Sequence, residues 1–535
     1  MPDGAFDGII IGSGYNGLTL AGYMAKQGLK VLVLERRMHY GGATITEEVT
    51  VPGVYHNLHA NFTWSYGPPH QDFELHKYGL KLMYGEVERC YLFEDGTTLT
   101  TYTDDPHRTY KQFKDVIGKA DTDTLEEIFY RYLVKVEEEF YAPPKPNEER
   151  GVGLSDSVRR EYQRHCAMSG RELLDDLYES DKLKTFIAVN ACVRGNTDFY
   201  PGVGDFFLRY SASPRLSIIR GGTSQLAHSL AAFLHANGGI ILNGCHVEKI
   251  NVEGGRATGV ELADGRKFTA SRFVASEVDP PATFLRMVGA DHLPDIIVRR
   301  CENWEVEQHN ALFGFHAAVT VQPDYSKKYG EEANRALCIF LGINSMAELD
   351  SHWKQIDQGK LPAKPGGDCC CHTVIDPSYG APGKNPLLFW QAGPASDKLA
   401  DGKTYDDLKW EYFETVADRW REYAPNLTED VYLGKYCYTP SDIENRIINM
   451  VGGGCRQGSY GNGQWNFGRP FPECNSYSTP IEGLYLCGSC CHPGGSLHFG
   501  PGYNCANKIV EDLGLKKWWP PYKIVGKPVV SSKPL

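Results

Sequence analysis

A short apolar run that leads directly into a glycine-rich turn constrains this chain more than any other feature. Residues 6–11 (FDGIII) precede Gly12-Ser13-Gly14-Tyr15-Asn16-Gly17. A helix-like stretch, 18–27, and a second apolar run, 30–34, follow before Glu35. This order of strand, tight turn, helix, strand and acid is typical of a Rossmann-type dinucleotide-binding unit.

Each residue type in this motif has a physical reason for its place. Gly12 permits the tight turn, Gly14 lets the backbone approach a pyrophosphate, and Gly17 lets helix and strand pack closely. The helix N-terminus offers unpaired N–H groups to phosphates. Glu35 lies 18 residues after Gly17, near the spacing of an acid that accepts hydrogen bonds from a ribose hydroxyl. We therefore predict a cofactor cradle that contains Gly12, Gly14, Tyr15, Asn16, Gly17 and Glu35.

Length and charge limit the class of protein. A chain of 535 residues predicts two or three domains. Its formal net charge of −12 argues against nucleic acid as a partner. The N-terminus enters the first predicted strand at once, which leaves no room for a signal peptide and favours a cytoplasmic location. No run of 18 apolar residues predicts a membrane-spanning helix, while a peripheral membrane association stays open.

Two further segments resemble one family. The acid and Gly-Gly turn of residues 35–44 (ERRMHYGGAT) resemble those of FAD-binding amine-oxidase and phytoene-desaturase-like flavoproteins. Residues 484–495 resemble the final motif of the phytoene-desaturase-like (carotenoid desaturase and isomerase) flavoproteins. That match is carried by Leu484, Tyr485, Leu486, Gly488, His492, Pro493, Gly494 and Gly495. Residues 496–499 (SLHF) depart from the family, which commonly has small residues and a proline here.

The resemblance implies FAD as the cofactor and an α/β fold. A Rossmann-type FAD-binding domain is built from three separated blocks, with an inserted α+β substrate domain. The expected boundaries are FAD blocks at 1–70, 216–290 and 441–517, substrate-domain parts at 71–215 and 291–440, and a C-terminal tail at 518–535. A helix that starts near Gly502 or Tyr503 would place its dipole to stabilise negative charge on a reduced flavin. The further expected cofactor contacts are Arg36, Gly41, Gly42, Ala43, Val247, Gly488, Ser489, Gly494, Gly502 and Tyr503.

Local patterns predict several elements outside the first block. Asp-Gly pairs predict hairpins at 91–97 and 259–268. Helical spacing predicts helices at 125–141, 160–183, 224–237 and 406–423, and alternation predicts a strand at 313–321. Further strands are predicted at 240–242, 246–250 and 272–276, and a surface tail after Trp518.

Histidines supply the catalytic candidates. His498 lies in the segment that departs from the family, and it could act as a general base or hold a polar substrate atom; the alternative is a hydrogen bond to a backbone carbonyl. His59 lies in an aromatic segment, 54–64, which the resemblance places near the flavin; the alternative is a buried, hydrogen-bonded histidine. Cys369-Cys370-Cys371-His372 lacks the spacing of a metal site, and Cys487 and Cys490 are interpreted as packing residues, so no metal is predicted.

These features predict an FAD-dependent oxidoreductase, a desaturase or dehydrogenase that removes a hydride from a C–H bond of an apolar or aromatic small molecule. Its partners would be a hydrophobic substrate and an electron acceptor: oxygen, a quinone or another carrier. The alternatives are amine-oxidase-type C–N oxidation, a redox-neutral flavin-dependent isomerase and a flavoprotein without turnover. The sequence leaves open the substrate, the acceptor, the oligomeric state and whether the flavin is covalently attached.

Overall fold

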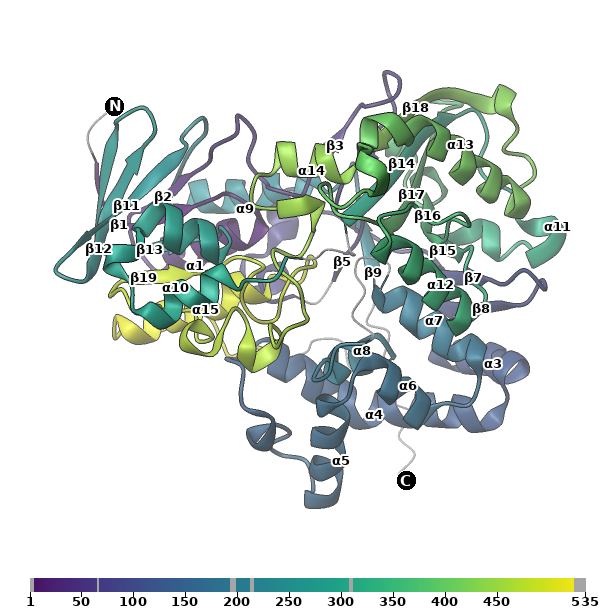
Figure 1. Cartoon of the computed structure of the whole chain (residues 1–535), viewed down its shortest axis with the longest axis horizontal. Coiled ribbons are helices and arrows are strands. Elements are labelled where there is room, and N and C mark those ends of the chain that lie inside the picture. The colour runs from purple at the N-terminus through teal and green to yellow at the C-terminus, as the bar shows by residue number, and fades with distance from the viewer. Residues whose placement is uncertain (1–3, 65–66, 193–198, 212–215, 307–310, 524–535) are drawn as a thin grey trace.

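The computed structural model describes residues 4–64, 67–192, 199–211, 216–306 and 311–523, and Figure 1 shows their arrangement. The first sheet has seven strands in the order β10-β2-β1-β13-β12-β11, with β19 also on β13. The parallel strands β1, β2 and β19 carry mainly apolar residues because helices cover them. The strands are β1 (Ala5–Ile11), β2 (Val31–Leu34), β10 (Ile240–Leu242), β11 (Val247–Glu253), β12 (Arg256–Leu262), β13 (Lys267–Ser276) and β19 (Leu484–Leu486).

Strand β13 joins segments of all three predicted FAD blocks. It runs parallel to β1 along one side; on the other, its first part pairs antiparallel with β12 and its last residues pair parallel with β19. The hairpin predicted at 259–268 is therefore present. The separate strand predicted at 272–276 is instead the second half of this one strand, because the chain stays extended through Arg272 to reach β19.

Three helices pack together on this sheet: α1 (Tyr15–Lys26), α9 (Ser224–Ala236) and α15 (Gly500–Asp512). Helix α1 lies between the other two, and all its residues except Lys26 are buried. Gly22 allows this close packing, since a Cβ there would lie 2.8 Å from the Phe73 ring. Helix α15 begins at Gly500, two residues before the predicted start, with Pro501 in its first turn.

The second sheet lies within the predicted substrate domain and has the order β18-β14-β17-β16-β15-β7-β8. Helix α13 (Tyr405–Tyr423) packs on one face, where Phe315 stacks on Phe413 with ring centroids 4.0 Å apart. The predicted hairpin, strand and helix at 91–97, 313–321 and 406–423 are present with shifted ends. The strands are β7 (Val87–Leu92), β8 (Thr98–Tyr102), β14 (Ala311–Val319), β15 (Ala336–Leu341), β16 (Gly367–Cys371), β17 (Asn385–Gly393) and β18 (Tyr432–Tyr438).

A helical part of the same domain lies below both sheets in Figure 1. The helix predicted at 125–141 is contained in α4. The stretch predicted at 160–183 is divided between three helices, because Ser169 starts α6 with a capping box and ends the run from α5. The helices are α3 (Pro106–Ile117), α4 (Lys119–Phe140), α5 (Asp156–Ala167), α6 (Gly170–Leu177), α7 (Asp181–Cys192) and α8 (Gly204–Ser211).

Short elements connect these units. They are β3 (Thr46–Glu47), β4 (His56–Asn57), β5 (Thr63–Trp64), β6 (Leu82–Met83), β9 (Leu216–Ile219), α2 (Pro68–Asp72), α10 (Asp295–Glu302), α11 (Ser326–Tyr329), α12 (Met346–Asp357) and α14 (Pro440–Arg446). Within the described ranges, no helix combines the length and apolar character needed to cross a membrane.

In the described part of the C-terminal tail, Pro520, Pro521 and Lys523 are exposed, as expected of a surface segment, whereas Trp519 packs against helix α1. Trp519 is buried, and its ring lies 4.7 Å from the Tyr23 ring of α1. Tyr522 packs on Tyr141 with centroids 4.2 Å apart. The indole rings of Trp518 and Trp519 lie next to apolar helices, and they bury more surface than the Pro- and Lys-rich composition of the segment suggests. Residues 524–535 lie outside the described part of the chain.

Candidate functional site

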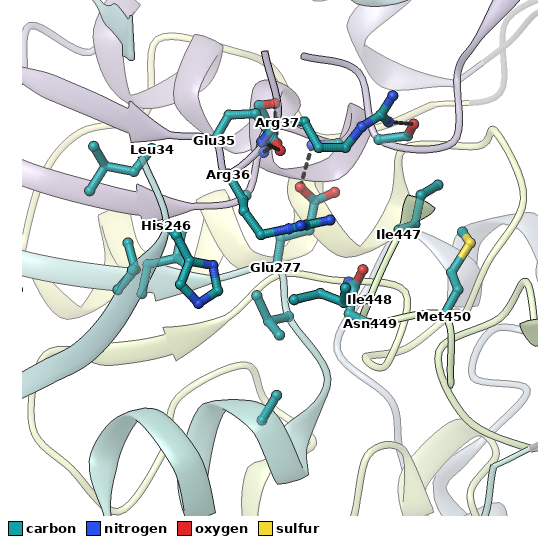
Figure 2. Close-up of a pocket in the computed structure, with 18 of the residues that line it drawn as sticks. Leu34, Glu35, Arg36, Arg37, His246, Glu277, Ile447, Ile448, Asn449 and Met450 are labelled. Atoms are coloured by element: carbon teal, nitrogen blue, oxygen red, sulfur yellow. Dashed lines mark hydrogen bonds between the residues drawn. The ribbon is translucent and has the colours of Figure 1, made fainter. Parts of the chain in front are cut away.

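A cavity of about 430 Å³ opens at the carboxyl ends of β1, β2 and β13 (Figure 2). Open α/β sheets bind their ligands at this edge. Residues from all three predicted FAD blocks line it, although they lie hundreds of positions apart in the sequence. The predicted cofactor residues that line it are Gly12, Gly14, Tyr15, Glu35, Arg36, Gly42, Ala43, Val247 and Ser489.

The turn requires glycines because neighbouring backbone segments approach it too closely to leave room for a Cβ atom. A Cβ on Gly17 would lie 2.6 Å from the carbonyl oxygen of Gly12, whose own φ of +98° disfavours a side chain. A Cβ on Gly42 would lie 3.0 Å from the Cα of Gly14, so the Gly-Gly turn packs directly against the first loop. The Gly41 N–H donates a 2.8 Å hydrogen bond to the Ser13 carbonyl and fixes this contact. The loop therefore presents bare backbone to the cavity, as a cofactor cradle requires.

A buried carboxylate occupies the N-terminus of α1. Glu277, directly after β13, accepts hydrogen bonds from the N–H groups of Gly14 at 2.6 Å and Asn16 at 3.2 Å. Burial raises the pKa of Glu277 to about 8, and the charge of Glu35 adds to the effect. These hydrogen bonds show that the amides at the start of α1 are directed at an oxygen acceptor, which is the arrangement that a cofactor pyrophosphate needs. The residues of the cavity thus fit a dinucleotide.

Glu35 lines the cavity and also fixes the turn. Its Oε2 accepts hydrogen bonds from the N–H of Ser13 at 3.1 Å and its hydroxyl at 2.6 Å, and its Oε1 accepts one from the Arg37 N–H at 2.8 Å. A carboxylate has about four acceptor sites, so capacity remains for a ribose hydroxyl. Arg36 is exposed at the edge and donates to the Arg446 carbonyl at 3.1 Å.

The other predicted cofactor residues do not line the cavity and pack around the residues that do. Gly502 serves helix packing, because a Cβ there would lie 2.3 Å from the Asn16 carbonyl oxygen in α1. Tyr503 packs on Tyr23, with ring centroids 5.6 Å apart. In the described chain, the predicted residues that do not line this cavity are Asn16, Gly17, Gly41, Gly488, Gly494, Gly502 and Tyr503. Their contact with a cofactor stays a prediction.

Arg469 holds the turn of the third block in place. Its buried guanidinium donates hydrogen bonds to the carbonyl oxygens of Ser489 at 2.7 Å, Arg456 at 2.8 Å and Ser459 at 3.0 Å. Gln457 completes the link, since its amide donates to the Glu277 carbonyl at 3.1 Å. One cation thus fixes the loop 456–459 against the turn that carries Ser489.

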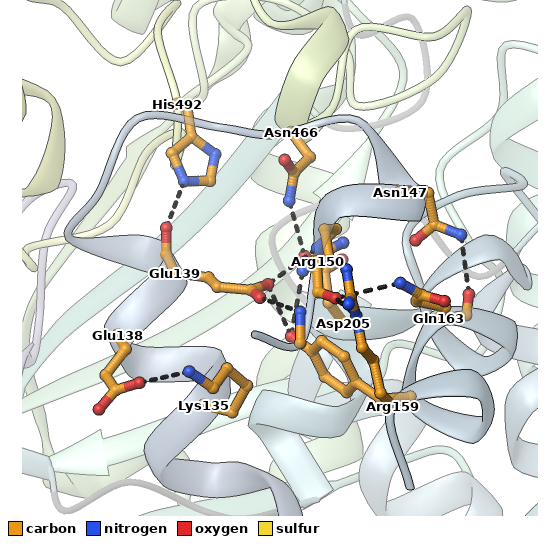
Figure 3. Close-up of polar contacts among 12 residues, drawn as sticks. Lys135, Glu138, Glu139, Asn147, Arg150, Arg159, Gln163, Asp205, Asn466 and His492 are labelled. Carbon is orange, nitrogen blue, oxygen red and sulfur yellow. Dashed lines mark hydrogen bonds and ion pairs between the residues drawn. The ribbon is translucent and has the colours of Figure 1, made fainter. Parts of the chain in front are cut away.

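An ion-pair network ties the helical part of the substrate domain to the same block (Figure 3). Arg150 lies between Asp205 and Glu139, with nitrogen–oxygen distances of 2.8 Å to each. Asn466 donates to Asp205 at 3.1 Å, and the His492 ring donates to the Glu139 carbonyl at 3.0 Å. His492 therefore connects the final motif to the end of α4.

His498 is held by backbone groups on both sides of its ring. Nε2 donates to the Gly495 carbonyl at 3.0 Å, and Nδ1 accepts from the Gly500 N–H at 3.0 Å. Burial keeps its pKa well below the usual value, so the ring is neutral. With both nitrogens occupied, these contacts favour the backbone-bonded alternative over a base; the catalytic assignment stays a prediction.

His59 is also buried, but only one of its ring nitrogens is occupied. Nε2 lies 2.7 Å from the Tyr438 hydroxyl of β18, whereas Nδ1 has no hydrogen-bond partner among the described residues. Burial, together with the charges of Arg446 and Arg37, lowers the pKa of His59 to about 3. A histidine with this pKa is a weak base at neutral pH, and it can hold a polar group by hydrogen bonding.

Sequence reasoning did not find several residues of the cavity. Glu277 carries a signal that could have identified it, because it is the first polar residue after the strand 272–276 and the carboxyl ends of such strands face the ligand. Gln457 and the loop 446–450 follow no recognisable motif, and they reach the cavity only through tertiary packing.

Comparisons with known proteins agree with this geometry. The family model described as "NAD(P)-binding Rossmann-like domain" matches residues 10–74. The chain is 27% identical over 543 residues to a subunit of limonene dehydrogenase from Castellaniella defragrans, covering 96% of each chain. It is 41% identical over 70 residues to the lycopene-forming phytoene desaturase of a Paracoccus species, covering 13% of this chain and 14% of that one.

A solved structure shows the same fold. Cyclohexylamine oxidase from Brevibacterium oxydans superposes with a TM-score of 0.59 at 17% identity, covering 96% of this chain and all of that one. At this identity the likeness extends to the arrangement of the two domains and carries no information on substrate.

Proposed function

Because this chain is a phytoene-desaturase-like, FAD-dependent oxidoreductase, we propose that it removes a hydride from a C–H bond of a compact, hydrophobic small molecule. The observation that carries the proposal is the cavity to which all three predicted FAD blocks contribute. A second substrate, either oxygen, a quinone or another carrier, would take up the electrons.

Bound FAD would supply the hydride acceptor at its N5 atom. The residues of the chain would hold and orient it. The N–H groups at the start of α1 would bind its phosphates, Glu35 would accept a ribose hydroxyl, and the backbone at Val247 would flank the adenine. The same burial that makes the neighbouring histidines neutral would keep water away from the reacting carbon.

The substrate class rests on two supports. One is a full-length relative whose name assigns it limonene, a compact hydrocarbon. The other is the inward face of the substrate-domain sheet, which presents the buried side chains of Leu388, Trp390 and Tyr438. Hydrophobic and aromatic side chains of this kind predominate in the lining of small-molecule sites.

Anaerobic titration of the FAD-loaded protein tests the proposal. Limonene and related monocyclic hydrocarbons or alcohols should bleach the visible absorbance of the flavin. Cyclohexylamine is the matched control for C–N oxidation. Bleaching by the amine alone would favour the amine-oxidase alternative, and bleaching by none of these compounds would contradict the proposed class of reaction.

A further inference from the structure

We propose that a cluster of buried histidines binds a neutral hydrogen-bonding group, a hydroxyl or a carbonyl, on the substrate. The histidine cluster consists of His56, His59, His316 and His372, and it lies between the substrate-domain sheet and the FAD domain. The inference rests on the proposed function, because it adds a polar end to the hydrophobic substrate. It narrows the substrate class to compact hydrophobic alcohols or ketones.

The two faces of strand β14 place His316 toward the FAD domain. Side chains alternate along a strand, so Phe313 and Phe315 point to the opposite face, where they pack on α13. His316 pairs in register with Leu388 of β17 and Tyr436 of β18. Leu388 belongs to the core cluster that also contains the strands of the FAD domain.

His316 is fully buried, yet the fold gives it no hydrogen bond that the structure describes. Neither Nδ1 nor Nε2 has a partner among the described residues. Its nearest aromatic neighbours are His56 and Tyr436, with ring centroids 5.4 and 6.0 Å away. Leaving a buried polar group unpaired costs roughly 1–3 kcal/mol. A ring with two such nitrogens would be stabilised by a bound ligand group that can both donate and accept a hydrogen bond.

Each of the other three histidines has one ring nitrogen in a hydrogen bond and one without a partner among the described residues. Nε2 of His56 lies 2.8 Å from the Thr50 hydroxyl, and Nε2 of His372 contacts Oδ1 of Asn61. Nε2 of His59 contacts Tyr438, as described above. In each ring Nδ1 is buried and lacks a partner within the described chain. The fold thus orients each of these three rings through one nitrogen and leaves the other available.

The charge state of the cluster selects the class of ligand. Burial lowers the pKa of His56 and His59 to about 3 and of His372 to about 4, and it holds that of His316 well below its usual value. The charged groups that face the cluster are Asp376 beside His372 and, beside His59, the Arg37 and Arg446 guanidiniums. All four rings are neutral at physiological pH, so they can bind a neutral dipole and cannot balance an anion.

Two further observations favour a substrate group. Among the residues that the structure describes, no three His, Cys, Asp or Glu side chains are arranged to hold a metal ion. Arg37 and Arg446 both line the candidate FAD cavity and their charges also lower the pKa of His59, so the His59 end of the cluster lies toward that cavity. A hydroxyl, which donates once and accepts twice, matches neutral imidazoles.

The test compares two probes that differ by one hydroxyl, perillyl alcohol and limonene, on the FAD-loaded protein. Anaerobic changes in flavin absorbance give the half-saturating concentration of each. We expect the unmodified protein to prefer perillyl alcohol, and His316→Phe to weaken its binding by ~10-fold or more, the effect of losing one or two hydrogen bonds. The half-saturating concentration of limonene should change by no more than about twofold in this variant, because the contacts of limonene are apolar.

His352→Phe is the matched control, since His352 of α12 is equally buried, has an unpartnered Nδ1 in the described structure and lies outside the cluster. It should change neither value. Equal binding of both probes to the unmodified protein would overturn the inference, and so would an equal loss of both in His316→Phe. If His316→Phe does not retain FAD, the inference is judged by whether the unmodified protein binds perillyl alcohol more tightly than limonene.

The two proposals fail in distinguishable ways. A preference for perillyl alcohol without bleaching of the flavin by either probe would leave the histidine site in place and refute the proposed reaction. Bleaching by limonene with equal affinity for both probes would support the reaction and refute the site.

Discussion

The carboxylate of Glu277 and the N–H of Gly14 form a 2.6 Å hydrogen bond at the N-terminus of α1. The same N–H belongs to the loop that would bind the phosphates of FAD. An acid and a phosphate therefore compete for one set of amides. The side chain of Glu277 has to share or leave this position when the cofactor binds, and this consequence can be measured.

At pH 9, above the raised pKa of Glu277, Glu277→Gln should bind FAD more tightly than the unmodified protein, by about tenfold, because it removes a negative charge close to the pyrophosphate; two unit charges 4 Å apart repel by roughly 4 kcal/mol at an effective dielectric constant of 20. Titration of the apoprotein with FAD, followed by fluorescence, gives the dissociation constant. Glu248→Gln is the control, since Glu248 lines the same cavity but is exposed. Weaker binding by Glu277→Gln would show that the carboxylate supports the cofactor.

The affinity for FAD should fall as the pH rises through about 8. Glu277 has its pKa raised to that value, so it is neutral below this pH and becomes an anion above it. The folded apoprotein also binds more protons than the unfolded chain between about 4.5 and 8, so its free energy of unfolding should decrease across this window. Glu277→Gln should flatten both profiles. Parallel profiles for the variant and the unmodified protein would assign the pH dependence to other groups.

Glu35→Ala should weaken the binding of FAD by about 1.5–3 kcal/mol, the value of a hydrogen bond to a charged group. Equilibrium dialysis of the variant measures this change. Ser13→Ala separates the two roles of Glu35, because it removes a hydroxyl that the carboxylate holds while leaving the acid in place. Equal losses in both variants would assign the effect to the geometry of the turn, and unchanged affinity in Glu35→Ala would contradict the ribose assignment.

Changes at the two catalytic candidates should affect different properties. His498→Ala removes a ring with two backbone hydrogen bonds, so we expect a lower melting temperature and an unchanged rate of flavin reduction. His59→Phe keeps a flat aromatic ring and removes the nitrogen available to a substrate, so the reduction rate should fall. Stopped-flow reduction with the substrate found by titration separates the two. A large loss of rate in a fully folded His498→Ala would restore that histidine as a catalytic residue.

Arg469→Lys should destabilise the protein by about 1–3 kcal/mol, because one ammonium cannot replace a buried guanidinium that donates to several carbonyls, and at least one buried carbonyl loses its donor. FAD should also be released at a lower temperature, since the turn with Ser489 loses its anchor. Thermal unfolding followed by flavin fluorescence reports both. Arg300→Lys, at a surface pair with Glu473, is the control and should change little.

The parts of the fold that sequence predicts are those fixed by local geometry. The turn at Gly12–Gly17 needs bare backbone and a helix start, and both requirements are visible in the residues themselves. The hairpins around Asp95-Gly96 and Asp264-Gly265 follow from turn chemistry in the same way. The prediction of a single helical stretch at 160–183 was wrong because Ser169 forms a capping box, a signal that competes with the helical periodicity.

The site was less accessible to prediction because its decisive contacts join distant segments. Nothing near His498 in the sequence shows that Gly495 and Gly500 occupy both of its ring nitrogens. The neighbours of His316 come from three other segments, so its unpaired nitrogens become visible only in the folded chain. Burial, which sets the pKa of both residues, is a property of the whole fold.

The packing of the first strand and helix against elements far along the chain has a consequence for its synthesis. The first strand meets its partner β13 only 265 residues later, since Ile11 pairs with Ser276, and α1 meets α15 only when residue 512 has been made. At roughly 5–20 residues per second, the apolar N-terminal block waits on the order of 25–100 s for its last partner. A ribosome that stalls within residues 291–440 would leave the apolar surface that α15 covers exposed on the nascent chain.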